Sequence, residues 1–363
     1  MTRLVERDGA VNAHTHLYSG LVPLGAPAPS PPPASFLEIL RRVWWRLDRA
    51  LDEDTLRAAA RFHVAHALLS GTTTLVDHHE SPSFIEGSLD VLAGVCDELG
   101  ARALLCYGAT ERNAGRDEAR RGLAECRRLI EARPSGTVRG AIGLHAGFTV
   151  SDETLREAGD LARSLGAVVH VHLAEDACDV EDARRRGHRA PLARLLACGA
   201  LPRGSILAHG VHLTEGDVYT CDARGLWLVH NPRSNANNRV GYARCLAASS
   251  RVALGTDGFP SDMDAEAESL RAEAAKHGDL AADPWLRREA GRALAAELFG
   301  PDAIRSDRVR LAEADHPQRV IEVDVGGRPV VRGGALVSAS LDHIEADARR
   351  AAKRLWARME DLP

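Results

Sequence analysis

Two histidines lie two positions apart near the start of the chain, in the segment Asn12-Ala13-His14-Thr15-His16. Residues at i and i+2 of a β-strand point to the same face, so both imidazoles reach one point in space. Histidine is the commonest metal ligand, and the pair therefore indicates a metal site. Buried strands with hydrogen-bonded, inert histidines show the same spacing, so the pair alone does not separate the two interpretations.

The rest of the chain alternates between predicted strands and helices. Besides the strand that ends at His14, strands are predicted over 71–77, 101–106, 137–144, 167–172, 205–208, 226–230 and 251–255. Helices are predicted over 54–69, 88–99, 116–131, 152–165 and 190–198. This alternation is typical of parallel strands joined by helical crossovers, and eight units predict a (β/α)₈ barrel.

Histidines and one aspartate stand where these strands end. The active site of such a barrel lies at the carboxyl ends of its strands. The residues at or directly after those ends are His14, His16, His79, His145, His172, His209 and Asp257. Because histidines placed at random would not select strand ends, this pattern indicates a functional site and argues against inert core residues.

Three imidazoles and one carboxylate suit a divalent metal ion that keeps a position for water. We expect one such ion, with zinc as the first choice and iron as the alternative. The candidate ligands are His14, His16, His172 and Asp257.

Glu175 follows His172 by three residues and lies beyond the predicted strand end, where it reaches the water without ligating the ion. Metal-bound water has its pKa lowered to about 7, so hydroxide is available at neutral pH. A carboxylate beside it can carry the proton to the leaving side. His209 either hydrogen-bonds that hydroxide or is a further ligand.

Composition limits the kinds of partner. The 363 residues, 45% of them hydrophobic, provide the core of one large barrel or of two average domains. The 46 basic and 51 acidic residues are intermixed, so we expect a small-molecule substrate, with no nucleic acid and no membrane as partners. Seven scattered cysteines without CxxC spacing and an N-terminus without an apolar segment favour a soluble cytoplasmic protein.

Two regions flank the predicted barrel units. The proline-rich segment 23–33 is predicted to be a loop, either a surface linker or a flap over the site. Beyond the barrel we expect helix over 270–298, strands within 308–338 that include a hairpin over 320–331, and a final amphipathic helix. We place the barrel at residues 9–300 and a C-terminal β-hairpin remnant with the amphipathic helix at 301–363. The buried stripe of that helix is predicted to be Ile344, Ala348, Ala351, Leu355 and Met359.

Four motifs resemble the mononuclear metal-dependent aminohydrolases of the amidohydrolase superfamily, in the same order along the barrel. They are His14-Thr15-His16, His172-Leu173-Ala174-Glu175, Ala208-His209-Gly210-Val211-His212 and Gly255-Thr256-Asp257-Gly258. Four stretches resemble the SsnA-like branch: Asn12-Ala13-His14-Thr15-His16-Leu17-Tyr18-Ser19, Asp77-His78-His79-Glu80-Ser81-Pro82, Gly143-Leu144-His145-Ala146-Gly147-Phe148-Thr149 and Asn231-Pro232-Arg233-Ser234-Asn235. Deaminases of guanine, 8-oxoguanine and S-adenosylhomocysteine are similar but more distant.

The resemblance implies a reaction as well as a ligand set. Hydroxide would add to an amidine-like ring carbon, Glu175 would carry a proton to the ring nitrogen, Asp257 would accept the second proton, and ammonia would leave. The metal would be bound by His14, His16, His172 and Asp257, and the catalytic residues would be Glu175, His209 and Asp257. The expected substrate contacts are His79, His145, Glu111, Arg112 and Tyr18, although Glu111 and Arg112 equally fit exposed loop charges.

Other readings of the same site stay open. The leaving group could be chloride, an alkylamine or an amidine nitrogen, or the barrel could be a non-catalytic interaction subunit. A two-metal centre bridged by a carbamylated lysine is excluded, because the fourth strand ends at His145 and the only lysines are Lys276 and Lys353. Relatives carry several strands before the first motif, whereas here only residues 1–13 precede His14. We therefore expect a reduced sandwich domain, or one completed by another chain, and a homodimer.

Overall fold

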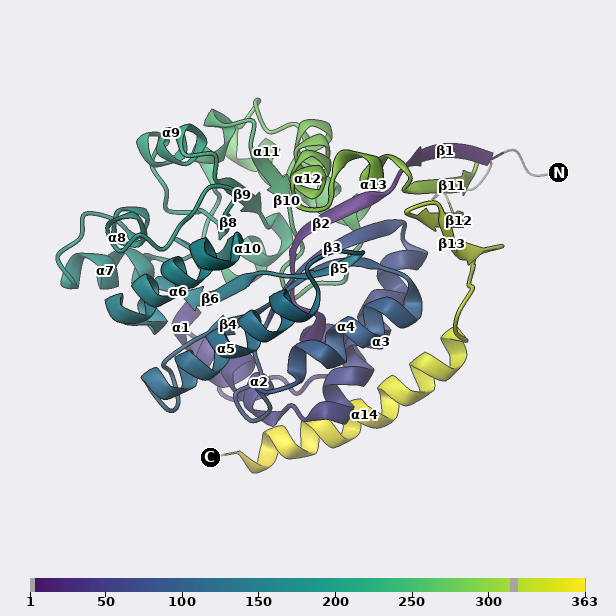
Figure 1. The fold of residues 1–363 in the computed structure, drawn as a ribbon, viewed down its shortest axis with the longest axis horizontal. Helices are drawn as coiled ribbons and strands as arrows, with labels where there is room; N and C mark the ends of the chain where they lie inside the picture. Colours follow the sequence, from purple (N-terminus) through teal and green to yellow (C-terminus); the bar gives the residue numbers. More distant parts are fainter. Residues whose placement is uncertain (1–3, 314–318, 363) are drawn as a thin grey trace.

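The computed structural model describes residues 4–313 and 319–362, and its centre is a barrel of eight parallel strands (Figure 1). Neighbouring strands pair in parallel, and the barrel closes where Thr15, at the end of the first strand, forms a bridge with Asp257. The predicted (β/α)₈ barrel is confirmed. Its strands are β2 (Ala10–Thr15), β3 (Thr72–His79), β4 (Arg102–Ala109), β6 (Ile142–Ala146), β7 (Val169–Leu173), β8 (Ile206–His209), β9 (Trp227–His230) and β10 (Val252–Leu254).

The helices that surround the barrel begin and end close to the predicted positions where polar caps and glycines mark them. The predicted ones are α3 (Glu53–Leu69), α4 (Ser88–Leu99), α5 (Arg116–Ala132), α6 (Asp152–Leu165) and α8 (Pro191–Ala197). Asp52, for example, caps α3 by accepting a hydrogen bond from the Thr55 backbone at 2.9 Å.

Several elements differ from the sequence-based prediction. The expected fourth strand is interrupted at Ala141, which leaves a short β5 (Val138–Gly140) before β6. The expected helix 270–298 is two helices, because Gly278 adopts a left-handed conformation (φ 64°) and Pro284 starts the next one. The helices are α11 (Met263–His277) and α12 (Pro284–Phe299), and those not predicted are α7 (Ala177–Arg185), α9 (Glu215–Ala223), α10 (Pro232–Asn238) and α13 (Pro301–Arg305).

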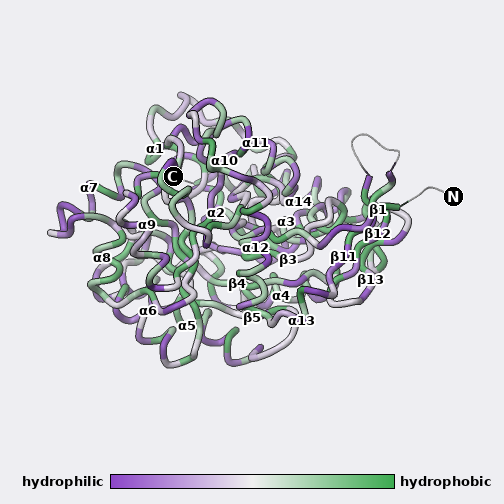
Figure 2. The backbone as a smooth tube through the Cα atoms, turned by 90° about the horizontal axis from the view of Figure 1, so that it is seen from above, coloured by the Kyte–Doolittle hydropathy of each residue, from purple (hydrophilic) through white to green (hydrophobic). Residues whose placement is uncertain are grey.

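A second, five-stranded antiparallel sheet lies at one end of the molecule (Figure 2). Its edge strand comes from the start of the chain, where Leu4 pairs with Ala312 and Asp8 with Arg308. The segment before the first histidine pair therefore extends the C-terminal sheet, which the sequence did not predict. The strands, in order, are β1 (Leu4–Asp8), β11 (Arg308–Ala312), β12 (Val320–Val325), β13 (Arg328–Arg332) and β14 (Ala335–Leu336).

The hairpin expected over 320–331 is β12–β13, and its turn residues Gly326 and Gly327 both have positive φ. Residues 314–318, within the region expected to form strands, lie outside the described residues. The division of the chain at residues 300 and 301 stays a prediction.

The last helix, α14 (Leu341–Asp361), packs against α3 and α2 (Trp45–Ala50) along the side of the barrel (Figure 1). Its predicted stripe is buried, as Ile344, Ala348, Ala351, Leu355 and Met359 are all 6% exposed or less. Each fully buried leucine or isoleucine of that stripe is worth roughly 1.5–3 kcal/mol relative to an exposed one. Among the described residues, no helix is long and apolar enough to cross a membrane.

The chain between β2 and α3 covers the mouth of the barrel. A 3-10 helix, η1 (Leu17–Leu24), leads through the proline-rich loop to α1 (Phe36–Ile39) and a π-helical turn, η2 (Leu40–Trp44), which continues into α2. Phe36, Leu40, Trp44 and Trp45 line a pocket over the barrel mouth, whereas none of residues 23–33 does. The wall over the site is therefore formed by the helical turns after the proline-rich loop, and the loop itself lies outside the pocket.

Candidate metal centre

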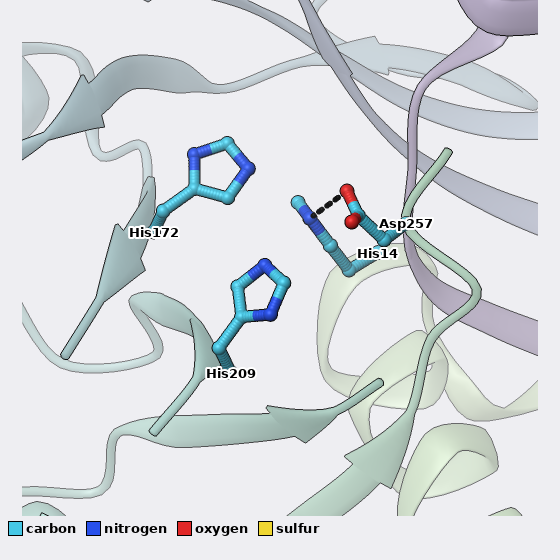
Figure 3. Close-up of side chains that lie close together, drawn as sticks. All are labelled: His14, His172, His209 and Asp257. Atoms are coloured by element: carbon cyan, nitrogen blue, oxygen red, sulfur yellow. Dashed lines mark ion pairs between the residues drawn. The ribbon is translucent and has the colours of Figure 1, made fainter. Parts of the chain in front are cut away.

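Strand ends bring histidines and an aspartate from distant parts of the chain to one point. His14 lies on β2, His172 on β7, His209 at the end of β8, and Asp257 directly after β10. Figure 3 shows these four side chains turned toward one another, with an ion pair between His14 Nε2 and Asp257 Oδ1 at 3.5 Å. One ligand atom of each of the four lies within 4.8 Å of the others, so a single ion could bind them all.

His16, the second histidine of the pair on β2, joins the same cluster. Its Nε2 lies 2.8 Å from Asp257 Oδ1 and 3.3 Å from His172 Nε2. The structure thus brings together all four predicted ligands, and it places His209 among them as a potential fifth.

Each of these imidazoles is held through its other ring nitrogen. His16 Nδ1 donates to the His78 carbonyl at 2.5 Å, and His172 Nδ1 donates to the His145 carbonyl at 2.6 Å. His209 Nδ1 donates to Asn235 Oδ1 at 2.9 Å. Because these oxygens only accept hydrogen bonds, each Nδ1 carries a proton, and the lone pairs of His172 and His209 are on Nε2. Burial acts to lower the pKa of His16, but Asp257 raises it to about 9, so its Nε2 also holds a proton that a bound ion would replace.

The tautomer of His14 follows from a fifth histidine inside the barrel. His14 Nδ1 lies 2.9 Å from His170 Nε2. The Cys106 thiol donates its one hydrogen to the Asp77 carbonyl at 3.4 Å, so its sulfur, 3.8 Å from His170 Nδ1, accepts from that nitrogen. His170 therefore carries its proton on Nδ1 and accepts at Nε2, so His14 donates from Nδ1 and has its lone pair on Nε2. His170 precedes His172 by two residues on β7, so both rings point to the same face of the strand. The sequence analysis assigned no role to His170.

The donor atoms fit a divalent cation. Among the described residues, His14 Nε2 and His209 Nε2 are buried and have no hydrogen-bond partner. Burial lowers the pKa of His14 to about 3 and holds the pKa of His172 well below its usual value, so both are neutral at neutral pH. Burial also acts to raise the pKa of Asp257, but its contacts with the His14 and His16 rings hold it well below its usual range. Neutral imidazole lone pairs around one carboxylate form a set that a metal ion satisfies.

Two smaller groups overlap with this cluster: His16 with His78 and His172, and Glu80 with His145 and His172. Both require His172, whose Nδ1 already donates to a carbonyl, so its Nε2 can serve one ion only. These two groups are therefore parts of the same metal centre, and they do not indicate a second one.

The backbone at the site is strained in three places. Of the four non-glycine residues with positive φ in the described chain, three are Ala174 (50°), His209 (76°) and Asp257 (53°). Such conformations cost about 1–3 kcal/mol each and persist where surrounding bonds hold them. Here Ala174 accepts a hydrogen bond from the His212 backbone at 2.9 Å, and Asp257 donates to the His14 carbonyl at 3.0 Å. Strain in this part of the molecule is concentrated at the candidate centre.

Glu175 stands beside the cluster, directly after the strained Ala174. Its Oε2 lies 3.6 Å from His209 Nε2, and its backbone amide donates to Asp179 Oδ2 at 3.2 Å. Burial, together with the nearby charge of Asp257, raises the pKa of Glu175 well above its usual range. The carboxyl group is thus easier to protonate than an exposed one, which suits a residue that accepts a proton and delivers it again.

One short helix, α10, contacts three residues of the centre. Ser234 donates to Asp257 Oδ2, Asn235 accepts from His209, and Asn238 Nδ2 lies 3.4 Å from Glu175 Oε1. Sequence reasoning assigned no role to these side chains, although Asn231 to Asn235 was among the motifs that carried the resemblance. Their spacing of i, i+1 and i+4 places them on one face of a helix, and Asn231 followed by Pro232 marks its start, although we did not predict a helix there.

A pocket opens onto the cluster from the barrel mouth. Its free volume is about 40 Å³ in this conformation, small beside the roughly 300–1,000 Å³ of ligand pockets, so the wall must move for a ligand to enter. The lining residues are His16, Tyr18, Phe36, Leu40, Trp44, Trp45, Asp48, Glu80, His145, Ala146, Phe148, His172, Glu175, Asp179, Asn238 and Asp257.

The predicted substrate contacts divide into two groups. Tyr18 and His145 line the pocket, whereas His79, Glu111 and Arg112 do not. For these five residues, a role in substrate binding stays a prediction.

The three residues outside the pocket lining have partners of their own. His79 is buried with its Nε2 2.8 Å from Ser81 Oγ. Arg112 pairs with Asp48 at 2.7 Å, and the Glu111 carboxylate accepts from the Ser151 backbone at 2.9 Å, where α6 begins. Arg112 is thus not the exposed loop charge of the alternative reading, because its side chain is 6% exposed.

Comparison with known proteins extends these observations. A model described as the amidohydrolase family matches residues 9–293. An 8-oxoguanine deaminase of Pseudomonas aeruginosa is 30% identical over 98% of this chain and 88% of its own length. A 5-methylthioadenosine/S-adenosylhomocysteine deaminase of Desulforudis audaxviator is 29% identical over 78% of this chain, and the match spans 64% of that relative's length. Among solved structures, an adenosine deaminase from Xanthomonas campestris with bound zinc has a TM-score of 0.84 at 25% identity, covering 97% of this chain and 86% of that one.

Proposed function

The chain belongs to the amidohydrolase family, and on that premise we propose that it is a metal-dependent hydrolytic deaminase of an amino-substituted nitrogen heterocycle. Water would replace the amino group on an amidine-like ring carbon, and ammonia would be released. The observation that carries the proposal is the position of Glu175, a carboxyl group able to hold a proton, beside a cluster of imidazole lone pairs.

The ion would be held by His14, His16, His172 and Asp257, with His209 as a further ligand or as a hydrogen-bond partner of the water. When bound, a divalent metal lowers the pKa of water so that a nucleophile is available at neutral pH. Zinc is our first choice, supported by the zinc bound to the similar adenosine deaminase structure, and iron is the alternative.

Two carboxyl groups would move the protons. Glu175 would accept one proton from the attacking water and deliver it to the ring nitrogen next to the reacting carbon. Asp257, whose pKa is held well below its usual range by the contacts with His14 and His16, would accept the second proton and pass it to the departing nitrogen. The balance is closed, since one water is consumed and one ammonia leaves for each carbonyl formed on the ring.

The composition of the pocket wall supports a planar substrate. Trp44, Trp45 and Phe148 line the same pocket as His16, His172 and Asp257, and aromatic rings pack well against a flat heterocycle. His145 has its Nδ1 engaged with Thr149 at 3.0 Å, which leaves Nε2 for a ligand. The names of the relatives, which describe deaminases of purine-type compounds, support a heterocycle of this kind.

A screen for released products tests the proposal. The zinc-loaded protein would be incubated with amino-substituted purines, pyrimidines and triazines, and with their chloro and alkylamino analogues, and ammonia, chloride and amine would be measured separately. We expect ammonia from at least one amino compound. Release of chloride or alkylamine alone would shift the proposal to another leaving group. No release from fully zinc-loaded protein would favour a non-catalytic barrel.

Two predictions from the sequence belong with this proposal. We propose that the protein is a homodimer and that it works in the cytoplasm on a small molecule. Sedimentation of the purified chain measures the oligomeric state. Localisation of a tagged chain in cells tests the cytoplasmic assignment.

A further inference from the structure

Glu80 is a buried carboxylate that neither the metal cluster nor the proposed proton transfer requires. It follows the end of β3, is 1% exposed, and lines the pocket next to Tyr18 and His145. A buried carboxylate is costly unless it is paired or satisfied by donors, so its position calls for a reason.

One of its oxygens faces His78. Glu80 Oε1 lies 2.7 Å from His78 Nδ1, and His78 Nε2 donates to the Leu144 carbonyl at 3.0 Å. The close contact fills the space beside Oε1, although neither Oε1 nor His78 Nδ1 has a hydrogen-bond partner among the described residues. A ligand therefore reaches Glu80 through its other oxygen.

The other oxygen has no donor in the described part of the chain. Glu80 Oε2 lies 3.7 Å from His16 Nδ1, which is too long for a hydrogen bond, and that nitrogen already donates to the His78 carbonyl. A carboxylate oxygen with spare acceptor capacity in a pocket is satisfied when a ligand offers an N–H group.

Gly108 on β4 makes room for this pair. A Cβ atom at Gly108 would lie 2.4 Å from Glu80 Oε1 and 2.5 Å from His78 Cε1, so any larger residue would displace both side chains. The space that holds Glu80 is thus built by the neighbouring strand.

The remaining polar atoms of the pocket point to the same kind of ligand. No arginine or lysine is among its lining residues, so no side chain there balances a phosphate or carboxylate tail. Asp48 Oδ1, a further acceptor, is also buried without a hydrogen-bond partner. The carboxyl groups of the lining are those of Asp48, Glu80, Glu175, Asp179 and Asp257.

We propose that Glu80 is a specificity-determining residue whose Oε2 accepts a hydrogen bond from an N–H group of the substrate. The pocket then selects planar heterocycles that carry an N–H donor in addition to the reacting amidine carbon, and that lack an anionic substituent. This inference rests on the proposed function, because it assigns a substrate class to the same site.

Two bicyclic probes test Glu80 without any turnover. Indole carries one ring N–H, benzofuran carries an oxygen in its place, and neither has a leaving group. We expect calorimetric titration of the zinc-loaded protein to give at least tenfold tighter binding of indole. Glu80→Met removes the acceptor. It should lower the affinity for indole at least tenfold and keep the affinity for benzofuran within twofold of the wild type. Glu86→Met, at an exposed position on the same loop, is the matched control and should bind both probes like the wild type.

Zinc content and thermal unfolding establish that each variant is folded and loaded. Equal affinity of the wild type for the two probes would overturn the proposal, and so would unchanged indole binding in a folded, zinc-loaded Glu80→Met. If Glu80→Met does not fold, Glu80→Asp takes its place, because it keeps the charge but withdraws the carboxylate from the pocket. Glu80→Asp must lower the ratio of indole affinity to benzofuran affinity at least threefold. An unchanged ratio would overturn the proposal. Failure of the proposed function would instead appear as absence of ammonia in the substrate screen, with the probe results unaffected.

Discussion

Asn235 Oδ1 accepts a hydrogen bond from His209 Nδ1 across 2.9 Å, and three residues further along the same helix Asn238 reaches Glu175. The two turns of α10 thus position a histidine from β8 and a carboxyl group from the end of β7. The first contact orients a histidine of the metal cluster, and the second orients the carboxyl group beside it.

Asn235→Ala should weaken zinc binding or turnover by about 10- to 100-fold, because residues that orient metal-site histidines typically contribute that much. The variant leaves His209 Nδ1 without its acceptor, so the ring is free to turn. Competition with a zinc chelator measures the affinity. Asn237→Ala, exposed on the same helix, is the control, and equal affinities in the two variants would contradict the assigned role.

Glu175→Gln should lower the rate of ammonia release by about 10²- to 10⁴-fold, the usual contribution of a general acid or base. Gln keeps the size and the hydrogen bond to Asn238 but cannot carry a proton. The zinc content should stay that of the wild type, as measured by elemental analysis. Glu181→Gln, exposed on α7, should keep full activity. A Glu175→Gln enzyme with wild-type turnover would refute the proton-transfer role.

Gly255→Ala should disrupt the close approach of β10 to β2. A Cβ atom there would lie 2.5 Å from Asn231 Oδ1 and 2.8 Å from the His14 carbonyl. We expect a loss of about 1–3 kcal/mol in the free energy of unfolding from overpacking, together with weaker zinc binding. Gly94→Ala is the control, because its Cβ would meet nothing within 4 Å on the exposed side of α4. Chemical denaturation measures the free energy of unfolding of both variants. Equal stability of the two would contradict this packing.

Much of the barrel could be predicted from the sequence because strand ends carry chemically distinctive residues. His14, His16, His172 and Asp257 are recognisable by type and spacing, and the intervals from His16 to His172 and from His172 to Asp257 contain whole strand–helix units. The interval lengths therefore sufficed to place all four at one rim.

Other parts of the site depend on contacts between segments that no local pattern reveals. Ser234, Asn235 and Asn238 lie in a stretch with three asparagines, which have low helix propensity, so α10 was not predicted. Glu80 follows a histidine pair, but only the burial of its side chain and the space left by Gly108 distinguish it from a loop carboxylate. The strand β1 was missed because its partner, β11, lies some three hundred residues further along the chain.

Asp52 caps α3 and forms an ion pair with Arg358 of α14, and this pairing depends on pH. Burial acts to raise the pKa of its carboxyl group, but hydrogen bonds from Thr55 and the charge of Arg358 lower it below the ordinary value. A carboxyl group with a lowered folded-state pKa stabilises the fold above its unfolded pKa of about 4, and this contribution is lost as the pH falls through the folded-state pKa.

Asp52→Ala should therefore lower the free energy of unfolding by about 0.5–2 kcal/mol at pH 7, the usual value of a helix cap. The difference from the wild type should shrink as the pH falls below about 4. Urea denaturation at pH 7 and at pH 3.5 measures it. Asp54→Ala, exposed in the same helical turn, serves as the control. A difference that stays constant with pH would show that the charge of Asp52 does not contribute.

The zinc content of the wild type and of His14→Ala tests the central claim most directly, because every proposed step depends on the metal cluster. Both proteins would be stripped of metal, loaded with zinc, desalted and analysed for zinc per chain, with circular dichroism to establish the fold. The account predicts close to one zinc per wild-type chain and almost none in a folded His14→Ala. A His14→Ala protein that retains one zinc per chain would contradict it.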